Sequence, residues 1–260
     1  MRSLIRTILG DKLSDTLRKT FPSSILSDFP GFYRYWKNRK SFQRLGGLID
    51  SSHVILSDFE DFAGESKGHY FHQDFLVASF IAAKNPVRHI DVGSRIDGFV
   101  AHVGSFREIE IIDVRELGEI GHPQVKFVQR DMMKSNPQFN EITDSLSCLH
   151  TIEHFGLGRY GDPVNPDGYK VGFQNLVDML KPGGTLYLSF PISKKNEVHF
   201  NAHRVFHPTD VLTWPLRNAA LTLERFDYVD DNGDLHRDKQ LDETTPEFRY
   251  GCGIYTFLKA

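Results

Sequence analysis

The order of apolar and polar positions predicts a mostly parallel, doubly wound α/β sheet. Short apolar runs recur between residues 88 and 190 and alternate with helical or turn segments. This alternation is typical of units in which successive strands pair in parallel. We expect strands at 88–92, 108–113, 125–129, 145–149 and 185–190, and helices at 71–84 and 171–180.

Two further strands are expected in the last quarter of the chain. Residues 222–228 and 254–258 are apolar runs that suit an antiparallel pair at the end of the sheet. The polar stretch 229–240 between them is expected to be a long exposed turn. The pattern therefore predicts one α/β domain over residues 69–260.

The preceding residues, 1–68, are expected to form a basic amphipathic arm and a linker. Residues 1–44 hold ten Lys or Arg and three Asp, a net charge of +7 in a chain whose net charge is −3. Apolar positions from Leu4 to Leu17 recur at helical spacing, and residues 29–40 hold five aromatic and four basic side chains. The arm either packs on the domain or makes a peripheral contact with an anionic membrane surface.

The remaining composition is that of an ordinary globular protein. Apolar residues make up 40% of the chain, and the two cysteines, Cys148 and Cys252, sit in apolar runs, which indicates buried thiols in a reducing compartment. The first residues make a poor secretory signal, and no run reaches the ~20 apolar residues that span a bilayer. We expect a cytoplasmic protein, or one peripheral at the inner face of the membrane, with no nucleic-acid partner.

In a doubly wound sheet, ligands bind beyond the carboxyl ends of the strands. The first strand ends in the sequence RHIDVGSRIDG (88–98), where Gly93 allows a tight turn and a close approach of the backbone to a ligand. The second strand ends at Asp113, 22 residues after Asp91, a spacing that suits hydrogen bonds to the two hydroxyls of a ribose.

The next two strands also end in polar residues. Asp131 and Met132 follow the third strand, and the flexible Met132 side chain could flank a flat base. His150, Glu153 and His154 follow the fourth. Four successive strand ends that carry glycine, acid, acid and histidine indicate a binding site far more strongly than any one of them.

Residues 71–260 resemble the class I S-adenosylmethionine-dependent methyltransferases. The resemblance rests on DVG at 91–93, Asp113, VKFVQRD at 125–131, DSLSCLHTIEH at 144–154 and NLVDMLKPGGTLYLSFP at 175–191. The stretches HTIEHFGLGRYGDP (150–163) and FNAHRVFHP (200–208) resemble, more narrowly, an uncharacterised methyltransferase-like family associated with bacterial surface-polysaccharide genes.

The resemblance implies a seven-stranded sheet with its last strand antiparallel, and S-adenosylmethionine as cofactor. It places Gly93 against the methionine part, Asp113 at the ribose, and Asp131 and Met132 beside the adenine. Asp91, Ser94, Arg95 and His150 complete the expected cofactor set. Arg95 and Asp97 depart from the usual glycines of this loop. Arg95 could bind the cofactor carboxylate, bind a phosphate of another ligand, or pair with Asp97 or Asp91.

His154 is the candidate catalytic base, because a neutral imidazole suits proton removal near neutral pH. Glu153 is expected to orient His154 or a substrate hydroxyl. The alternative is that His154 only packs in the turn after the fourth strand.

The candidate substrate residues lie in two later segments: Arg159, Tyr160, Asp162, His203 and Arg204. The first three belong to a glycine-rich loop, for which a purely structural turn is the alternative. Histidines recur four apart at 199, 203 and 207 and again at 150 and 154, which raises a divalent metal as a hypothesis, with Asp162 as a further ligand. We do not favour it, because Val205, Phe206 and Pro208 predict an extended stretch, so no metal ligands are assigned.

These features predict a methyltransferase that modifies an oxygen of a sugar or glycan intermediate in surface-polysaccharide biosynthesis. Its substrate would be a small molecule or a lipid-linked sugar. One alternative keeps the fold and binds a nucleotide or sugar phosphate for a non-methyl transfer or lyase reaction. Another is a non-catalytic scaffold, since the fold alone does not choose a reaction.

Overall fold

The computed structural model describes residues 23–56, 58–59, 61–119, 121–217, 220–242 and 244–260. The chain divides between Glu65 and Ser66 into two compact units, which are described separately. The amphipathic helix expected over Leu4 to Leu17 lies outside the described residues.

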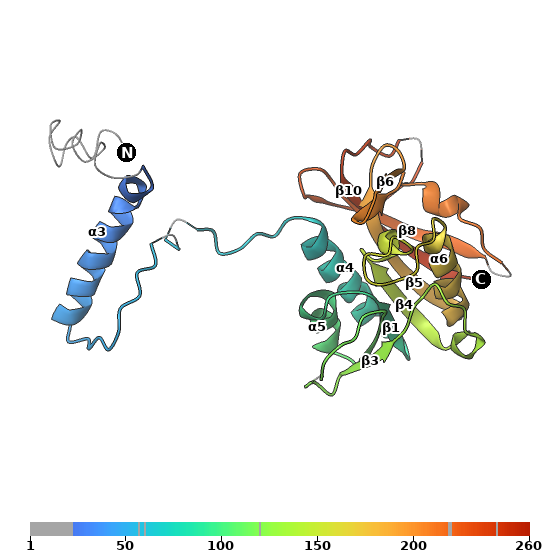
Figure 1. Ribbon diagram of the computed structural model, residues 1–260, viewed down its shortest axis with the longest axis horizontal. Coiled ribbons are helices and arrows are strands. Elements are labelled where there is room, and N and C mark those ends of the chain that lie inside the picture. The colour runs from blue at the N-terminus through green and yellow to red at the C-terminus, as the bar shows by residue number, and fades with distance from the viewer. Residues whose placement is uncertain (1–22, 57, 60, 120, 218–219, 243) are drawn as a thin grey trace. The chain divides into compact units, whose positions relative to one another are not determined.

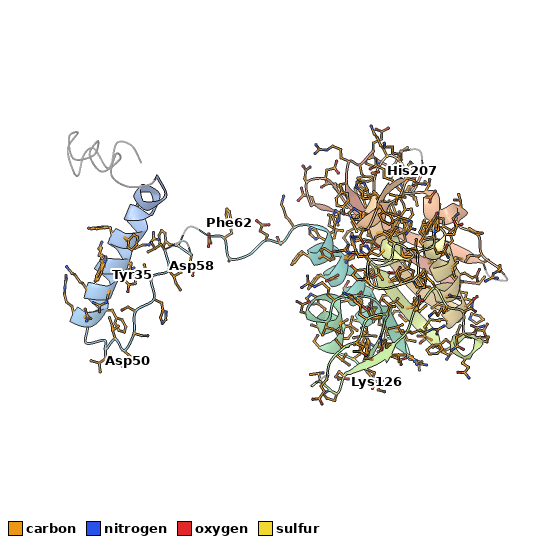
Figure 2. All side chains as sticks on the ribbon, viewed as in Figure 1. Tyr35, Asp50, Asp58, Phe62, Lys126 and His207 are labelled. Carbon is orange, nitrogen blue, oxygen red and sulfur yellow. The ribbon has the colours of Figure 1, made fainter. Side chains whose placement is uncertain are left out.

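The first unit is built on α3 (Ser23–Arg44), a helix with Pro30 inside it. The aromatic and basic stretch is therefore helical and does not belong to a linker. Arg34 donates a hydrogen bond to the carbonyl of Leu56 at 3.2 Å and lies 3.7 Å from the ring centroid of Phe59. Figure 2 shows the side chains that project from α3, with Tyr35 labelled.

The second unit holds an eight-stranded sheet with the order β3-β2-β1-β4-β5-β10-β8-β9. Its strands are β1 (His89–Val92), β2 (Ile109–Asp113), β3 (Val125–Gln129), β4 (Thr143–Leu149), β5 (Leu180–Ile192), β8 (Leu221–Val229), β9 (Leu235–Lys239) and β10 (Gly251–Lys259). The first five strands pair in parallel, whereas β10 is antiparallel to β5 and to β8. This is the doubly wound, mostly parallel sheet that the pattern predicts.

Helices cover both faces of this sheet. On one face, α4 (His69–Lys84) and α5 (Ala101–Gly104) bury Leu76, Val77, Ile81 and Val103. On the other face, α6 (Gly168–Met179) buries Phe173, Leu176 and Val177. Figure 1 shows α4 and α5 on one side of the strands and α6 on the opposite side. Each such side chain stabilises the fold by about 1.5–3 kcal/mol through its burial.

Short helical turns and a small hairpin complete the unit. The turns are η1 (Ile96–Val100), η2 (Pro137–Phe139), η3 (Ile152–His154) and η4 (Asp210–Thr213). The hairpin pairs β6 (Glu197–His199) with β7 (His203–Val205) and sets His199 opposite His203. The extended conformation that Pro208 and its apolar neighbours predict is confirmed for this stretch.

The expected count of seven strands was wrong by one, because β9 forms in the segment taken for an exposed turn. β9 pairs antiparallel with β8 after a tight turn. In that turn Asp230 accepts hydrogen bonds from the amides of Asn232 and Asp234, and Gly233 has a φ of +79°. Pairing with β9 covers the edge of β8 that would otherwise carry unpaired backbone groups.

Candidate functional site

Two adjoining hollows lie at the carboxyl ends of β1 to β4. The walls of the smaller hollow include Val92, Asp113, Asp131, Met132 and Phe155. The larger hollow has a volume of about 520 Å³, and its walls include Gln73, Asp74, Glu153, Arg159, His203 and Tyr250. Five residues line both hollows: Gly93, Arg115, His150, His154 and Tyr160. The cleft thus has a mostly apolar part and a polar part with a common wall.

The turn after β1 passes directly beside this common wall. Gly93 has a φ of +78°, and a Cβ atom at this position would lie 2.3 Å from Cγ2 of Thr151. Only glycine fits this combination of backbone angle and close approach. The turn therefore exposes its backbone to the cleft, as the sequence predicts.

Asp91 supports the turn from beneath and does not line either hollow. Its fully buried carboxyl group accepts hydrogen bonds from the Ser94 amide (3.0 Å), the Ser94 hydroxyl (2.9 Å) and the Ser147 hydroxyl (2.5 Å). Burial raises the pKa of Asp91 to about 7, although these hydrogen bonds act in the opposite direction. Of the predicted cofactor residues at this turn, Gly93 and Ser94 reach the cleft, while Asp91 positions them.

Arg95 pairs with Asp97 in the structure, through Nε at 3.0 Å and Nη2 at 2.7 Å. Both side chains are largely exposed, at 74% and 71%. Of the three roles considered for Arg95, the structure contains the pairing with Asp97. Arg95 lines the larger hollow and does not line the smaller one.

Asp113 ends β2 at the smaller hollow, where the sequence places a ribose. Its carboxylate is engaged by Arg115, with Nη2 at 2.6 Å and Nε at 3.0 Å, and by the Arg115 amide at 2.8 Å. The Arg115 guanidinium also lies 4.6 Å from the ring centroid of Tyr160. A ligand hydroxyl at Asp113 would therefore have to share the carboxylate with Arg115 or displace it.

Asp131 lines the same hollow from the end of β3. One carboxylate oxygen, Oδ1, accepts a hydrogen bond from the Met133 amide at 2.9 Å. The other, Oδ2, is buried and has no hydrogen-bond partner among the described residues, although Lys134 Nζ lies 3.8 Å from it. Met132, only 4% exposed, forms the adjacent apolar wall. A buried acceptor beside an apolar wall can take a hydrogen bond from the amino group of a flat heterocycle.

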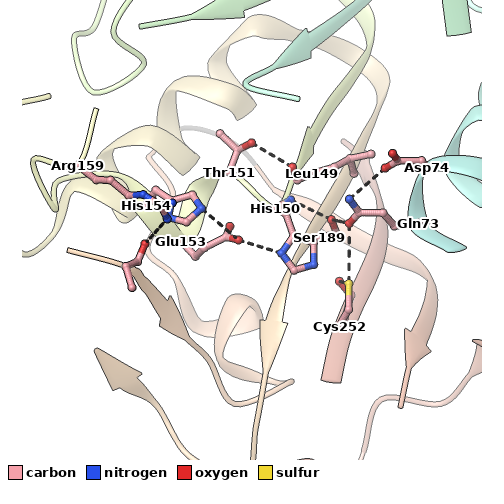
Figure 3. A network of polar contacts seen from close by, with 12 residues as sticks. Gln73, Asp74, Leu149, His150, Thr151, Glu153, His154, Arg159, Ser189 and Cys252 are labelled. Carbon is pink, nitrogen blue, oxygen red and sulfur yellow. Dashed lines mark hydrogen bonds and ion pairs between the residues drawn. The ribbon is translucent and has the colours of Figure 1, made fainter. Parts of the chain in front are cut away.

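His150 and Glu153 form a buried pair after β4 (Figure 3), with His150 Nδ1 lying 3.1 Å from Glu153 Oε1. Burial alone lowers the pKa of His150, but Cys252 and the hydrogen bond to Glu153 outweigh it. The pKa of His150 therefore lies well above its ordinary value. His150 lines both hollows, and Glu153 lines the larger one.

His154 has the geometry of a proton acceptor. Its Nδ1 lies 2.7 Å from the carbonyl oxygen of Ala202, and a carbonyl can only accept, so this nitrogen carries the hydrogen. In the neutral ring, Nε2 then has the free lone pair; it lies 3.8 Å from Glu153 Oε1. Burial lowers the pKa of His154, which favours the neutral ring near pH 7.

The glycine-rich loop after η3 contains both structural residues and cleft residues. The Asp162 carboxylate accepts hydrogen bonds from the amides of Gly156, Gly158 and Tyr160, so its main contacts fold the loop. The side chains of Arg159 and Tyr160 line the larger hollow. In this loop, Asp162 therefore has a structural role, whereas Arg159 and Tyr160 are placed to contact a substrate.

His203 and Arg204 are adjacent in sequence but lie in different surroundings. His203 lines the larger hollow, and its ring centroid lies 6.4 Å from that of His154. Arg204 is 4% exposed and donates hydrogen bonds to the carbonyls of Glu153, Phe155 and Pro166. It lines neither hollow, and its contacts hold the loop in place.

The histidines considered for a metal at 199, 203 and 207 do not converge. His199 Nε2 lies 2.9 Å from Glu197 Oε2, and His207 Nδ1 lies 2.9 Å from the Thr209 hydroxyl. Within the described ranges, these residues do not enter any cluster of three ligand atoms. The same ranges contain no helix that is both long and apolar enough to cross a bilayer.

Several cleft residues escaped the sequence analysis. Gln73 and Asp74 lie in an apolar helix, where two adjacent polar residues were the only signal. Burial raises the pKa of Asp74 to about 6. Arg115 could have been suspected from its place two residues after Asp113. Tyr250 had no local signal, because β10 brings it to the cleft from a distant part of the sequence.

Comparison with known families gives a partial match. A family model described as Caenorhabditis protein of unknown function, DUF268, matches residues 123–240, which run from the loop before β3 through β9. Curated proteins gave no match to the chain.

Solved structures with the same fold include the 4+2 cyclase SpnF, which is 13% identical over 89% of this chain and 96% of that chain, with a TM-score of 0.51. The N-methyltransferase NodS from Bradyrhizobium japonicum, in complex with S-adenosyl-L-homocysteine, is 13% identical over 84% of this chain and 97% of that chain (TM-score 0.47). The 1,6-didemethyltoxoflavin-N1-methyltransferase from Burkholderia thailandensis, with 1,6-didemethyltoxoflavin and S-adenosylhomocysteine bound, is 16% identical over 72% of this chain and 78% of that chain (TM-score 0.45). The similarity to SpnF establishes the Rossmann-like α/β fold.

Proposed function

We propose that the protein is an S-adenosylmethionine-dependent methyltransferase. The observation that carries the proposal is the buried Oδ2 of Asp131, which accepts no hydrogen bond and has only the Lys134 ammonium 3.8 Å away. Asp131 lines the smaller hollow, which adjoins the hollow lined by His154. An adenosine needs an apolar slot with one acceptor for its amino group, and the smaller hollow offers that combination. The reacting end of the cofactor would then extend toward the common wall.

The described residues offer a contact for each part of this cofactor. Asp131 would accept a hydrogen bond from the adenine amino group, and Met132 would pack against the ring. Asp113 would accept from the ribose hydroxyls, and the turn at Gly93 would face the methionine part. The bound cofactor supplies an electrophilic methyl group on a sulfonium, so positioning contributes much of the rate.

His154 would take the proton from the acceptor hydroxyl through Nε2. The carbonyl of Ala202 holds the tautomer that leaves this lone pair free, and Glu153 lies near enough to stabilise the imidazolium that forms. The acceptor would therefore bind in the larger hollow. Gln73, Asp74, Arg159 and His203 line it and can form hydrogen bonds with several hydroxyls.

A hydroxyl of a sugar or glycan intermediate is the acceptor class that suits this polar wall. The narrower assignment to surface-polysaccharide biosynthesis rests on the resemblance of residues 150–163 and 200–208. The basic arm supports it, because such an arm could hold the enzyme near a lipid-linked substrate.

One observation favours a second candidate function. Arg115 already occupies the carboxylate of Asp113, and a guanidinium at this place could bind a phosphate of a nucleotide or sugar phosphate. SpnF is a cyclase with a similar fold, so the fold does not fix the reaction. Direct binding measurements separate the two candidates.

We expect calorimetric titration to show binding of S-adenosylmethionine and of S-adenosylhomocysteine. Substitution Asp131→Ala should weaken both by about 10- to 100-fold, because a hydrogen bond to a charged acceptor contributes about 1.5–3 kcal/mol. Asp234→Ala, which removes a surface carboxylate paired with Lys67, serves as the matched control and should leave the affinity unchanged. If the protein binds nucleotides or sugar phosphates but binds neither S-adenosylmethionine nor S-adenosylhomocysteine, the methyltransferase proposal is refuted and the second candidate is favoured.

For the reaction, we expect transfer of a labelled methyl group to at least one member of a panel of sugars and nucleotide sugars. His154→Gln should lower kcat by about 10²–10⁴, with little change in the affinity for S-adenosylhomocysteine. Full activity in this variant would exclude His154 as the base. A folded protein that binds the cofactor but methylates no acceptor of the panel would count against a sugar acceptor.

A further inference from the structure

A second cluster of ligand atoms lies behind the wall of the larger hollow. His69, His150 and Cys252 each direct one nitrogen or sulfur atom into it, and these three atoms lie within 4.8 Å of one another. The residues come from the first turn of α4, the turn after β4 and the second residue of β10. The three residues are far apart in the sequence, and the order of the strands in the sheet brings them together.

Two polar atoms in and beside the cluster are buried without a hydrogen-bond partner among the described residues: His150 Nε2 and Glu153 Oε2. The His150 side chain is only 5% exposed. Figure 3 shows its ring with one nitrogen directed to Glu153 and with Cys252 on the other side. The Cys252 thiol is the neighbouring group and raises the pKa of this ring, but it makes no hydrogen bond of ordinary geometry with Nε2. A buried ring nitrogen without such a bond costs about 1–3 kcal/mol, so it points to a ligand.

The backbone of His150 supports the same conclusion. Its φ of +47° lies in the left-handed region, which is uncommon for residues other than glycine, although asparagine, aspartate and histidine adopt it more often than the rest. With this backbone conformation, Nδ1 faces Glu153 and the other edge of the ring lies toward Cys252. Strain of this kind persists where a functional arrangement requires it.

We propose that His69, His150 and Cys252 bind a Zn²⁺ ion. The donor set of two imidazoles and one thiolate suits zinc, which prefers nitrogen and sulfur ligands in tetrahedral geometry. Three protein ligands leave the fourth position to water. Coordination forms two Zn–N bonds and one Zn–S bond, and the protons held by the thiol and by His150 Nε2 are released to solvent.

The dimensions require a small contraction of the cluster. With bonds of about 2.0–2.1 Å to nitrogen and about 2.3 Å to sulfur, neighbouring ligand atoms of a tetrahedral site lie about 3.3–3.7 Å apart. The present atoms lie within 4.8 Å of one another, so the ion would draw them together by no more than about 1.5 Å. His69 is half-buried and begins α4, so its ring is the one most able to move.

Glu153 supplies the outer contact that such sites commonly contain. A histidine that binds zinc through one nitrogen usually donates the hydrogen of its other nitrogen to a carboxylate, which fixes the ring. His150 Nδ1 makes this contact with Glu153 Oε1 at 3.1 Å. The ion would tie α4, the β4 turn and β10 together beside the cleft, and this proposal holds whether or not the protein methylates a substrate.

The test is a titration of the full chain, first stripped by a chelator, with Zn²⁺ against a chromophoric competitor and with Co²⁺ followed by absorption. We expect one ion per chain and a thiolate-to-cobalt charge-transfer band. Cys252→Ser should abolish the band, and His69→Gln should weaken Zn²⁺ binding at least tenfold. Glu153→Gln should weaken it about 10- to 100-fold.

Cys148→Ser is the matched control, because Cys148 is also a buried free thiol but lies outside the cluster. It should retain full binding and the cobalt band. The proposal is overturned if the stripped wild-type protein takes up no ion at stoichiometric concentration. It is equally overturned if a folded His69→Gln variant, checked by circular dichroism, binds as tightly as wild type, or if the band is lost in Cys148→Ser and kept in Cys252→Ser.

Discussion

Asp91 and Asp131 stand at the ends of two strands of the same sheet, yet their carboxylates have opposite surroundings. Asp91 accepts three hydrogen bonds from its own turn and from β4, and it is closed off from the cleft. Asp131 lines the cleft and has one buried oxygen that accepts no hydrogen bond and lies 3.8 Å from Lys134 Nζ. An acid at a strand end is thus a support in one case and a candidate ligand contact in the other.

The buried Asp91 makes stability depend on pH. Its pKa is raised from 3.8 to about 7 in the folded protein, so between these values the folded state holds a proton that the unfolded state has lost. The stabilising contribution of this group is complete below pH 3.8 and is lost as the pH rises toward 7. In this window the loss amounts to up to about 1.4 kcal/mol of unfolding free energy per pH unit.

We therefore expect Asp91→Asn, which cannot titrate, to lack this part of the pH dependence. As the pH rises from about 5 to 7, the unfolding free energy of the wild type, measured by urea denaturation, should fall relative to that of Asp91→Asn. Asp234→Asn, an exposed carboxylate, is the control and should show no comparable shift. A constant difference across this window would show that Asp91 titrates normally.

The sequence predicted the positions of the cleft residues better than their partners. Gly93, Asp113, Asp131, His150 and His154 all line the cleft, because strand ends are set by local pattern. The pairing of Asp113 with Arg115 and the capture of Arg204 by three carbonyls could not be predicted. Both depend on distances across loops that no local pattern encodes.

At the scale of elements, apolar strands were predictable and polar ones were not. β3 begins and ends at the predicted residues, and β1, β2 and β4 differ from prediction by one or two residues at their starts. β9 was missed because its sequence, LHRDK, has one apolar residue and the strand lies at the edge of the sheet. The Asn232-Gly233 pair was the available signal, since this dipeptide favours tight hairpins.

Long-range pairing also explains why the site was only partly visible in the sequence. The hairpin of β6 and β7 brings Ala202 to His154 and His203 to the larger hollow. β10 brings Tyr250 and Cys252 beside His150 and His69. These contacts join residues about 50 to 180 positions apart, and only the completed sheet specifies them.

At the scale of the whole molecule, the chain combines a folded α/β unit with a basic, aromatic first unit. Between Pro30 and Arg44 it holds five Lys or Arg and no acid. Tyr33, Trp36 and Phe42 of α3 are 66%, 52% and 54% exposed. Aromatic and basic side chains on one helix suit the headgroup level of an anionic membrane, so we retain the proposal of a peripheral contact through residues 1–44.

We expect the full chain to sediment with vesicles that contain anionic lipid, and to do so less as salt is added. Deletion of residues 1–44 should remove most of this binding, because each basic side chain near the surface contributes about 1 kcal/mol. Neutral vesicles serve as the control for apolar adsorption alone. Equal sedimentation of the truncated and full chains would contradict a membrane role for the arm.

The place of β10 in the sheet bears on how the protein is made. Among the described strands it is the last to leave the ribosome, yet it lies inside the sheet, between β5 and β8. Until it is synthesised, β8 and β9 form a hairpin with no link to the parallel strands, and β5 presents an open edge. The nascent domain must therefore wait for its final strand, and a chaperone that shields the open edge of β5 during translation would protect it from aggregation.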